Sequence, residues 1–231
     1  MSASTTASPS RREPELLGQT VVVIGGSAGM GLETARRASI EGARVVLTGR
    51  DPERLERAAS ELDALSSAAF DATDPASLER FFRDLPATID HVMVTAGRPH
   101  YGRLIDLDFE EARRAVDEHI LLMIQVARNA RKVRLGGTLL FVGGTGARRP
   151  VVGLGMVSTI TAALPVLTAN LALELARPGQ PHRRRLCRYT VVGVPARRRT
   201  RKPPQAASRN ASHRTRRRTR RRRRTRGAHH D

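Results

Sequence analysis

The chain has 231 residues and a formal net charge of +19, enough length for one α/β domain or for a smaller domain with an appendage. The charge is segregated, because residues 1–176 hold 20 Lys and Arg against 21 Asp and Glu, and residues 177–231 hold 21 against one. A single cysteine, Cys187, excludes an intrachain disulfide framework and a cysteine-based metal centre. The seven histidines lack ligand spacing, so we predict no metal site.

Residues 1–17 contain no apolar run that would serve as a secretory signal, and we predict that they form a disordered leader. The chain also has no stretch of about 18 uninterrupted apolar residues, which argues against a membrane-spanning helix. We therefore expect a cytoplasmic protein that does not bind membranes.

Strand and helix patterns alternate between residues 18 and 176. Five short apolar runs are typical of strands buried on both faces: VVVIGG, ARVVLTG, SSAAF, HVMVTAG and GTLLFVGG. Helical patterns cover residues 31–41, 52–62, 75–83, 110–133 and 157–175. This alternation predicts an α/β domain with a Rossmann-type, doubly wound parallel sheet. Pro165 should kink or restart the last helix, because proline lacks the amide donor and clashes with the preceding turn.

The first predicted strand ends in a glycine turn, GGSAGMG, that opens a helix. Its glycines allow a tight turn, close approach of a diphosphate, and close helix–strand packing, and the helix N-terminus favours the anion. The predicted dinucleotide-binding residues here are Gly25, Ser27, Gly29, Met30 and Gly31. A tight turn without a ligand is the alternative interpretation.

The second predicted strand ends in LTGRD, where NAD-binding sites usually present a carboxylate to the ribose. Here the chain has Gly49 followed by Arg50, whose guanidinium can pair with a 2′-phosphate. The alternative is a solvated charge partnered by Asp51 or Glu53. We therefore favour NADP(H) over NAD(H) as the cofactor.

Together these motifs resemble the short-chain dehydrogenase/reductase family over about residues 18–176. Its TGxxxGxG motif is matched from Ile24 to Gly31, with isoleucine in place of threonine. FDATD and VTAG resemble the family's adenine-contacting segment and its NNAG motif, and LTANLALELA resembles the helix that follows the catalytic tyrosine. The further cofactor-binding residues that the resemblance implies are Asp71, Ala72, Ala96 and Gly97.

The family's catalytic residues are all substituted. The resemblance implies a serine, a YxxxK pair and an asparagine at Gly144, Val157, Thr161 and His119, and none of them is present. In the family the tyrosine exchanges a proton with the substrate oxygen, which valine cannot do.

The catalytic residues are therefore unassigned, and weak candidates are His119, Thr145, Ser158 and Thr161. Of these only His119 titrates near neutral pH. The alternative interpretations are a polar histidine on a partly buried helix and, for Thr145, a loop hydroxyl that faces water.

Residues 177–231 are rich in arginine and poor in large apolar residues, so we predict a disordered tail. One hypothesis is non-specific binding of nucleic acid through this tail, by counterion release without base stacking. The other, which we favour, is a displaced reading frame. Codons for residues 179–191 can be chosen so that a one-base shift gives VNLIAAGFVDTP, which resembles the family's continuation RVNxIxPGxxxTP. The fold would then be truncated after the fifth strand and helix, with the fifth strand left as a sheet edge.

The domain prediction is thus a leader at 1–17, an NAD(P)-binding domain at 18–176 and a basic tail at 177–231. We expect an NADP(H)-dependent short-chain oxidoreductase that acts on an unidentified small-molecule carbonyl or alcohol and forms a homo-oligomer through its long helices. The alternatives are a non-catalytic dinucleotide-binding protein, favoured by the missing tyrosine and lysine, and a nucleic-acid-binding protein.

Overall fold

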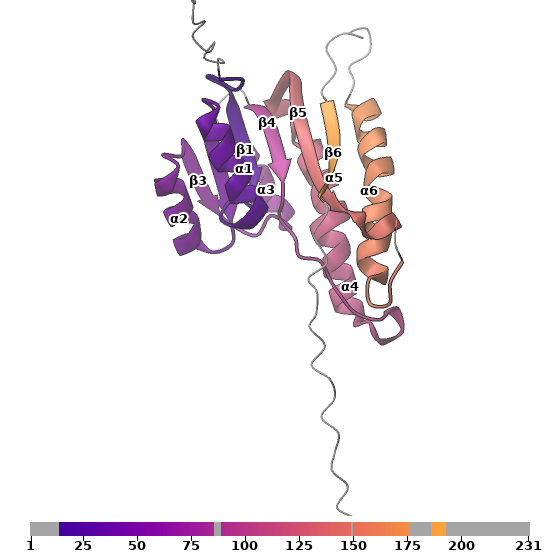
Figure 1. The fold of residues 1–231 in the computed structure, drawn as a ribbon. Helices are drawn as coiled ribbons and strands as arrows, with labels where there is room; N and C mark the ends of the chain where they lie inside the picture. Colours follow the sequence, from indigo (N-terminus) through magenta and orange to yellow (C-terminus); the bar gives the residue numbers. More distant parts are fainter. Residues whose placement is uncertain (1–13, 86–88, 149, 176–185, 193–231) are drawn as a thin grey trace, which may run out of the picture. The chain divides into compact units, whose positions relative to one another are not determined.

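A computed structural model describes residues 14–85, 89–148, 150–175 and 186–192. All of these residues belong to one compact unit. Its strands form one parallel sheet in the order β3-β2-β1-β4-β5-β6 (Figure 1). The strands are β1 (Thr20–Ile24), β2 (Arg44–Gly49), β3 (Ser66–Ala69), β4 (Ile89–Val94), β5 (Val133–Gly144) and β6 (Leu186–Val192). The predicted Rossmann-type parallel sheet is therefore confirmed.

The helices occupy the segments between the strands. They are α1 (Gly29–Ile40), α2 (Pro52–Glu61), α3 (Pro75–Asp84), α4 (Phe109–Val116), α5 (Leu122–Arg128) and α6 (Gly155–Glu174). Four shorter helical turns are η1 (Leu104–Asp106), η2 (Asp117–Leu121, a π-helix), η3 (Ala130–Lys132) and η4 (Thr145–Arg148). At the starts of α2, α3 and α4 an aspartate side chain accepts a backbone N–H from the first turn, which satisfies a donor that the helix leaves free.

Each face of the sheet buries its own core because successive strand residues point to opposite sides. Val21 and Val23 of β1 pack with β2, α1 and α2, whereas Val22 and Ile24 pack with β4, β5 and helices α3 to α6. Both faces of β1 are thus covered by helices, which explains why its sequence is an uninterrupted run of apolar residues.

The helix predicted over residues 110–133 is interrupted and ends early. The π-helix η2 separates α4 from α5, and Val133 is the first residue of β5 rather than the last of a helix. Val133 pairs with Ile89 of β4 and is 1% exposed. Burial in the sheet therefore decides the conformation at this boundary, against the local helical pattern.

Helix α6 continues through Pro165, so the predicted restart does not occur. Ile160, Leu164 and Leu171 lie on one stripe of the helix and are buried in the core, which holds the turns on both sides of the proline in place. By length and composition α6 is the one helix among the described residues that would suffice to cross a membrane. Its buried stripe identifies it as a helix that packs on the sheet.

The sheet is not truncated after its fifth strand. Strand β6 pairs in parallel with β5, in a register that runs from Leu186 beside Thr138 to Val192 beside Gly144. The expectation of a continuous disordered tail was wrong for these residues, because a composition averaged over 55 residues hides the short β-forming run YTVV. Residues 177–185 and 193–231, which hold most of the arginines behind the nucleic-acid hypothesis and the first part of the segment behind the reading-frame hypothesis, lie outside the described part of the chain.

Candidate cofactor site

The predicted glycine loop joins the carboxyl end of β1 to the start of α1. Gly25 has φ +92°, and a Cβ there would lie 2.7 Å from the backbone N of Ala96. Gly31 has no room for a Cβ either, because this atom would overlap the carbonyl oxygen of Gly25 and lie 2.5 Å from Thr95 Oγ1. Gly29 differs, since its φ is +55° and no described atom lies within 4 Å of its Cβ position. Gly25 and Gly31 thus allow the loop to pack closely against the end of β4. Gly29 leaves the backbone of the loop open to a ligand.

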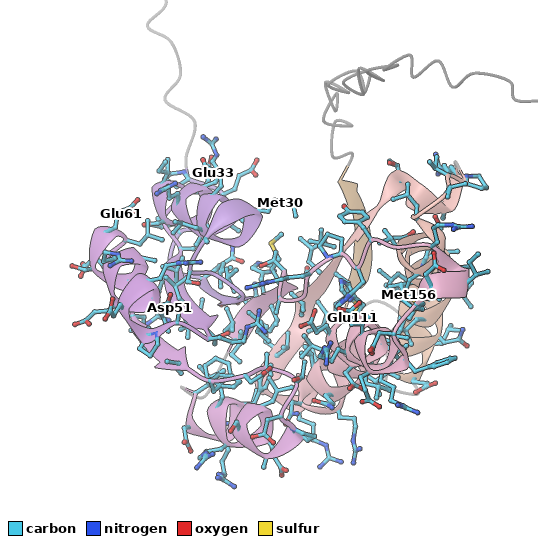
Figure 2. The ribbon with its side chains drawn as sticks, turned by 90° about the horizontal axis from the view of Figure 1, so that it is seen from below. Met30, Glu33, Asp51, Glu61, Glu111 and Met156 are labelled. Atoms are coloured by element: carbon cyan, nitrogen blue, oxygen red, sulfur yellow. The ribbon has the colours of Figure 1, made fainter. Side chains whose placement is uncertain are left out.

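No side chain among the described residues caps the N-terminus of α1. Its N-cap residue, Ala28, makes no side-chain hydrogen bond among the described residues, and the first turn carries no acidic residue. The first backbone N–H groups of a helix need a partner and carry the positive end of the helix dipole. Met30 stands beside them and is 46% exposed, and Figure 2, seen from below the sheet of Figure 1, shows its side chain extending away from α1. This arrangement suits a diphosphate.

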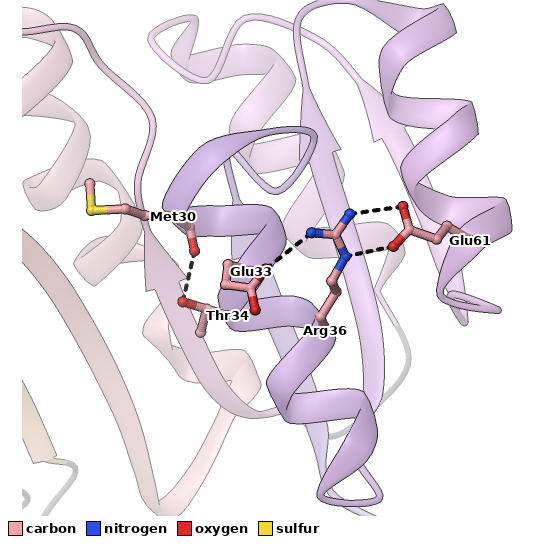
Figure 3. Close-up of polar contacts among 5 residues, drawn as sticks. All are labelled: Met30, Glu33, Thr34, Arg36 and Glu61. Atoms are coloured by element: carbon pink, nitrogen blue, oxygen red, sulfur yellow. Dashed lines mark hydrogen bonds and ion pairs between the residues drawn. The ribbon is translucent and has the colours of Figure 1, made fainter.

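An ion-pair network fixes the orientation of α1 against α2 (Figure 3). Arg36 donates from Nε and Nη2 to the two carboxylate oxygens of Glu61 at 2.6 and 3.0 Å, and from Nη1 to Glu33 at 3.0 Å. The hydrogen bonds from Arg36 lower the pKa of Glu61 below its usual range, and those from Glu61 and Glu33 raise the pKa of Arg36. The network is exposed, so its role is to orient the helix rather than to stabilise the fold strongly.

Ser27 links the loop to the second strand, because a Cβ on Gly49 would lie 2.8 Å from Ser27 Oγ. Arg50 follows Gly49 and is the predicted 2′-phosphate residue. Its side chain is 51% exposed, and its Nη1 lies 3.8 Å from Glu118 Oε1. Asp51, one of the two partners considered from sequence, instead caps α2 and pairs with Arg54 at 3.6 Å.

Glu118 was not among the site residues predicted from sequence. It lies in η2, far from Arg50 along the chain, and its side chain is only 14% exposed. Its Oε2 accepts a hydrogen bond from the backbone N of Arg98 at 2.8 Å and lies 3.7 Å from Nε2 of His100. No spacing rule connects these positions, so only the tertiary structure could bring them together.

The remaining predicted cofactor residues follow β3 and β4 at the carboxyl edge of the sheet. Asp71 Oδ1 accepts hydrogen bonds from the backbone N and the hydroxyl of Thr73, at 2.9 and 2.8 Å, and Ala72 is buried. The backbone N of Ala96 donates to Ile24 O, and Gly97 has φ +108°. Because all the strands are parallel, these residues share the carboxyl edge with the glycine loop.

Thr95 stands where the family has an asparagine, and it joins β4 to the glycine loop. Its hydroxyl lies 3.2 Å from Ile24 O and 3.1 Å from Gly25 O, and can donate to either. The same oxygen is the atom that a Cβ on Gly31 would meet. Thr95 therefore holds the loop in shape, a role that its substitution for asparagine did not predict.

Three of the four catalytic candidates follow β5 along the chain, Thr145 in η4 and both Ser158 and Thr161 in the first turns of α6. A Cβ on Gly146 would lie 3.3 Å from Ser158 Oγ and 3.6 Å from Thr161 Oγ1. Ser158 donates to Gly146 O at 3.0 Å, and Thr161 donates within its own helix to Val157 O and Ser158 O. Thr145 is exposed in η4. Gly144 and Thr161, where the resemblance implies a serine and a lysine, are neighbours, since a Cβ on Gly144 would lie 3.5 Å from Thr161 Cγ2.

His119, the fourth candidate, lies in η2 against the end of β4. Its Nδ1 is 3.0 Å from Ala115 O, so this hydrogen bond requires a proton on Nδ1, and in the neutral ring Nε2 is then an acceptor. A Cβ on Gly97 would lie 3.1 Å from Nε2 and Cε1 of the ring. The imidazole is therefore held beside a predicted cofactor residue. The described residues contain no group of three or more potential metal ligands.

Comparison with known proteins identifies the family. A family model described as short chain dehydrogenase matches residues 19–179, so the chain belongs to the short-chain dehydrogenase family. Members of this family are oxidoreductases that bind a nicotinamide dinucleotide.

Two curated relatives illustrate the match. Dehydrogenase/reductase SDR family member 4 of Oryctolagus cuniculus is 31% identical over 177 residues, which cover 72% of this chain and 68% of the relative. The short-chain dehydrogenase/reductase ATR9 of Stachybotrys chlorohalonatus is 27% identical over 179 residues, which cover 71% of each chain.

Solved structures agree with this assignment. BdcA in complex with NADPH has a TM-score of 0.67 and 26% identity, covering 77% of this chain and 70% of its own. A short chain dehydrogenase from Burkholderia cenocepacia J2315 in complex with NADP has a TM-score of 0.65 and 26% identity, covering 69% of each chain.

Proposed function

We propose that this protein is an NADP(H)-dependent short-chain oxidoreductase that interconverts a carbonyl and an alcohol on a small molecule. The observation that carries the cofactor choice is Arg50, a half-exposed guanidinium at the end of β2 where a carboxylate would select NAD. The open backbone at Gly29 and the uncapped N-terminus of α1 fit the diphosphate. Two structural neighbours hold NADPH or NADP, which supports the same choice.

The bound cofactor would supply the hydride chemistry, and the chain would supply placement and proton transfer. Gly25, Gly29 and Gly31 shape the loop, Asp71 and Ala72 would contact the adenine, and Ala96 and Gly97 would lie along the dinucleotide. His119 is the proton-transfer residue that we would test first, since its Nε2 is an acceptor beside Gly97. Ser158 and Thr161 are weaker candidates, because both hydroxyls already donate to backbone oxygens.

The cofactor assignment is tested by titrating NADPH and NADH against the full chain, followed by fluorescence. In the variant Arg50→Ala, NADPH affinity should fall by roughly 10- to 100-fold through loss of a charge-assisted hydrogen bond, while NADH affinity stays unchanged. Arg54→Ala is the matched control, because this nearby arginine already pairs with Asp51. An equal loss for both cofactors in Arg50→Ala would contradict the assignment.

A second candidate function is dinucleotide binding without catalysis. Val157 and Thr161 occupy the positions of the family's tyrosine and lysine, and Thr161 is 7% exposed with its hydroxyl bonded within α6. A proton donor of the usual kind is thus missing from these two positions. Oxidation of NADPH with any member of a carbonyl panel, and its loss in His119→Gln, would reject this candidate.

We also propose that the chain forms a homo-oligomer in the cytoplasm. Large apolar side chains are exposed on α4, η2 and α6, namely Phe109, Val116, Leu121, Val166 and Leu173. Burial of such side chains against a second copy would remove apolar surface from water. Light scattering coupled to size exclusion would give a mass above 25.3 kDa, and a monomer at micromolar concentration would reject the proposal.

A further inference from the structure

The carboxylate of Glu118 lies 3.8 Å from Arg50, at the carboxyl edge of the sheet where β2 ends. It comes from η2, whereas Arg50 comes from the end of β2, and Arg98 and His100 come from the segment after β4. These three segments meet where β1 is flanked by β2 on one side and β4 on the other. Dinucleotides bind in the crevice outside such a point in doubly wound folds. Glu118 therefore places a negative charge beside the adenosine half of the proposed site.

The contact between Arg50 and Glu118 is an ion pair without a direct hydrogen bond. Their closest atoms are 3.8 Å apart, compared with 2.6 Å between Arg36 and Glu61. The guanidinium of Arg50 is half exposed, whereas the carboxylate of Glu118 is nearly covered. Arg50 is thus the partner that can move, and Glu118 is the fixed one.

Glu118 keeps partners when Arg50 turns away. The backbone N–H of Arg98 donates to Oε2 at 2.8 Å, and Nε2 of His100 lies 3.7 Å from the same oxygen. That His100 nitrogen is buried and makes no hydrogen bond among the described residues. Transfer of Arg50 to a phosphate would therefore not leave the carboxylate unsatisfied.

We propose that Glu118 sets the cofactor preference of this chain by opposing the 2′-phosphate that Arg50 would bind. The carboxylate neutralises Arg50 in the free protein and repels the phosphate dianion in the complex. NADH carries a 2′-hydroxyl in place of the phosphate, so neither the neutralisation of Arg50 nor the repulsion changes its affinity. Glu118 therefore weakens the binding of NADPH alone and reduces the preference for NADPH over NADH. The proposal rests on the proposed function, because it requires that Arg50 is the 2′-phosphate residue.

The test compares wild type, Arg50→Ala, Glu118→Gln and the double variant. Glutamine keeps an oxygen for the Arg98 N–H and removes only the charge. The probes are NADPH and NADH, with adenosine 2′,5′-bisphosphate and 5′-AMP as ligands that lack the nicotinamide. Glu118→Gln should bind NADPH and the bisphosphate about five- to tenfold more tightly, the size of one near-surface charge interaction, and NADH and 5′-AMP within about twofold of wild type.

Two controls make the result specific. Asp117→Asn removes the same charge one residue earlier and should change NADPH affinity by less than about twofold, since no contact joins Asp117 to Arg50 among the described residues. In the Arg50→Ala background, Glu118→Gln should lose most of its effect. Glu118→Asp shortens the side chain and so moves the carboxylate away from Arg50. This variant should also bind NADPH more tightly than wild type, and it replaces Glu118→Gln in the test if the glutamine variant does not fold.

The outcomes separate the two proposals. If Arg50→Ala weakens NADPH but Glu118→Gln changes nothing, or changes NADPH and NADH equally, the role of Glu118 is wrong and the proposed function stands. An equal gain in Asp117→Asn would likewise overturn the role of Glu118. If no variant binds either dinucleotide, both proposals are wrong.

Discussion

Gly31→Ala is the sharpest test of how the glycine loop is built. The added Cβ would overlap the carbonyl oxygen of Gly25 and lie 2.5 Å from Thr95 Oγ1, and neither atom belongs to a flexible side chain. Overpacking of this kind costs about 1–3 kcal/mol, whereas alanine gains roughly 1 kcal/mol over glycine in a helix. Since the clash involves backbone, we expect a net loss of about 2 kcal/mol, or roughly 4–8 °C in Tm for a domain of this size.

The assay is thermal unfolding followed by circular dichroism, with NADPH titration on the same samples. Gly29→Ala is the matched control, because its Cβ meets no described atom and only the positive φ is unfavourable, at about 1 kcal/mol. Gly31→Ala should therefore lose more stability than Gly29→Ala, and should lose at least about tenfold in NADPH affinity as the start of α1 shifts. A Gly31→Ala protein as stable as wild type, with unchanged NADPH affinity, would refute the packing argument.

Three further predictions concern the framework of the site. Thr95→Val should cost about 1 kcal/mol in urea unfolding, because its hydroxyl hydrogen bonding to Ile24 O and Gly25 O is lost, and an unchanged midpoint would contradict this. Leu164→Ala should cost about 2–5 kcal/mol, since Leu164 is fully buried on the face of α6 that packs in the core, whereas Ile40→Ala, at an exposed position of α1, should change the urea midpoint little. Burial lowers the pKa of His91 below its ordinary value of 6.5, so the folded state favours neutral imidazole. Stability should therefore fall as pH drops from about 6.5 through the lowered folded pKa, and His91→Gln should flatten this part of the curve of Tm against pH; an equally steep curve would argue against it.

The sequence was sufficient for five of the six strands that the structure describes, and for the glycine loop. Alternating apolar runs and helical patterns predicted five of the strands in the correct order of elements, because strands buried on both faces must be apolar throughout. The glycine positions were also predictable, since a tight turn and close packing tolerate few other residues. Gly25 and Gly31 have the close neighbours that this argument requires.

Local patterns failed where long-range pairing decides the structure. Val133 continues a helical pattern but pairs with Ile89, and β6 lies within a segment whose average composition resembles a disordered tail. Strand pairing depends on an available edge elsewhere in the chain, which the composition of the strand itself does not report.

The arrangement of charges at the candidate site was likewise beyond the sequence. Arg50 could be identified from its place at a strand end, but its neighbour Glu118 is separated from it by two strands and several helices. Arg50 follows the carboxyl end of β2, and Glu118 lies in η2, so the two side chains come into contact only through the tertiary fold. The sequence by itself determined the elements and the glycine loop, through local conformation and burial, and the tertiary structure alone decided which charges face one another across that edge.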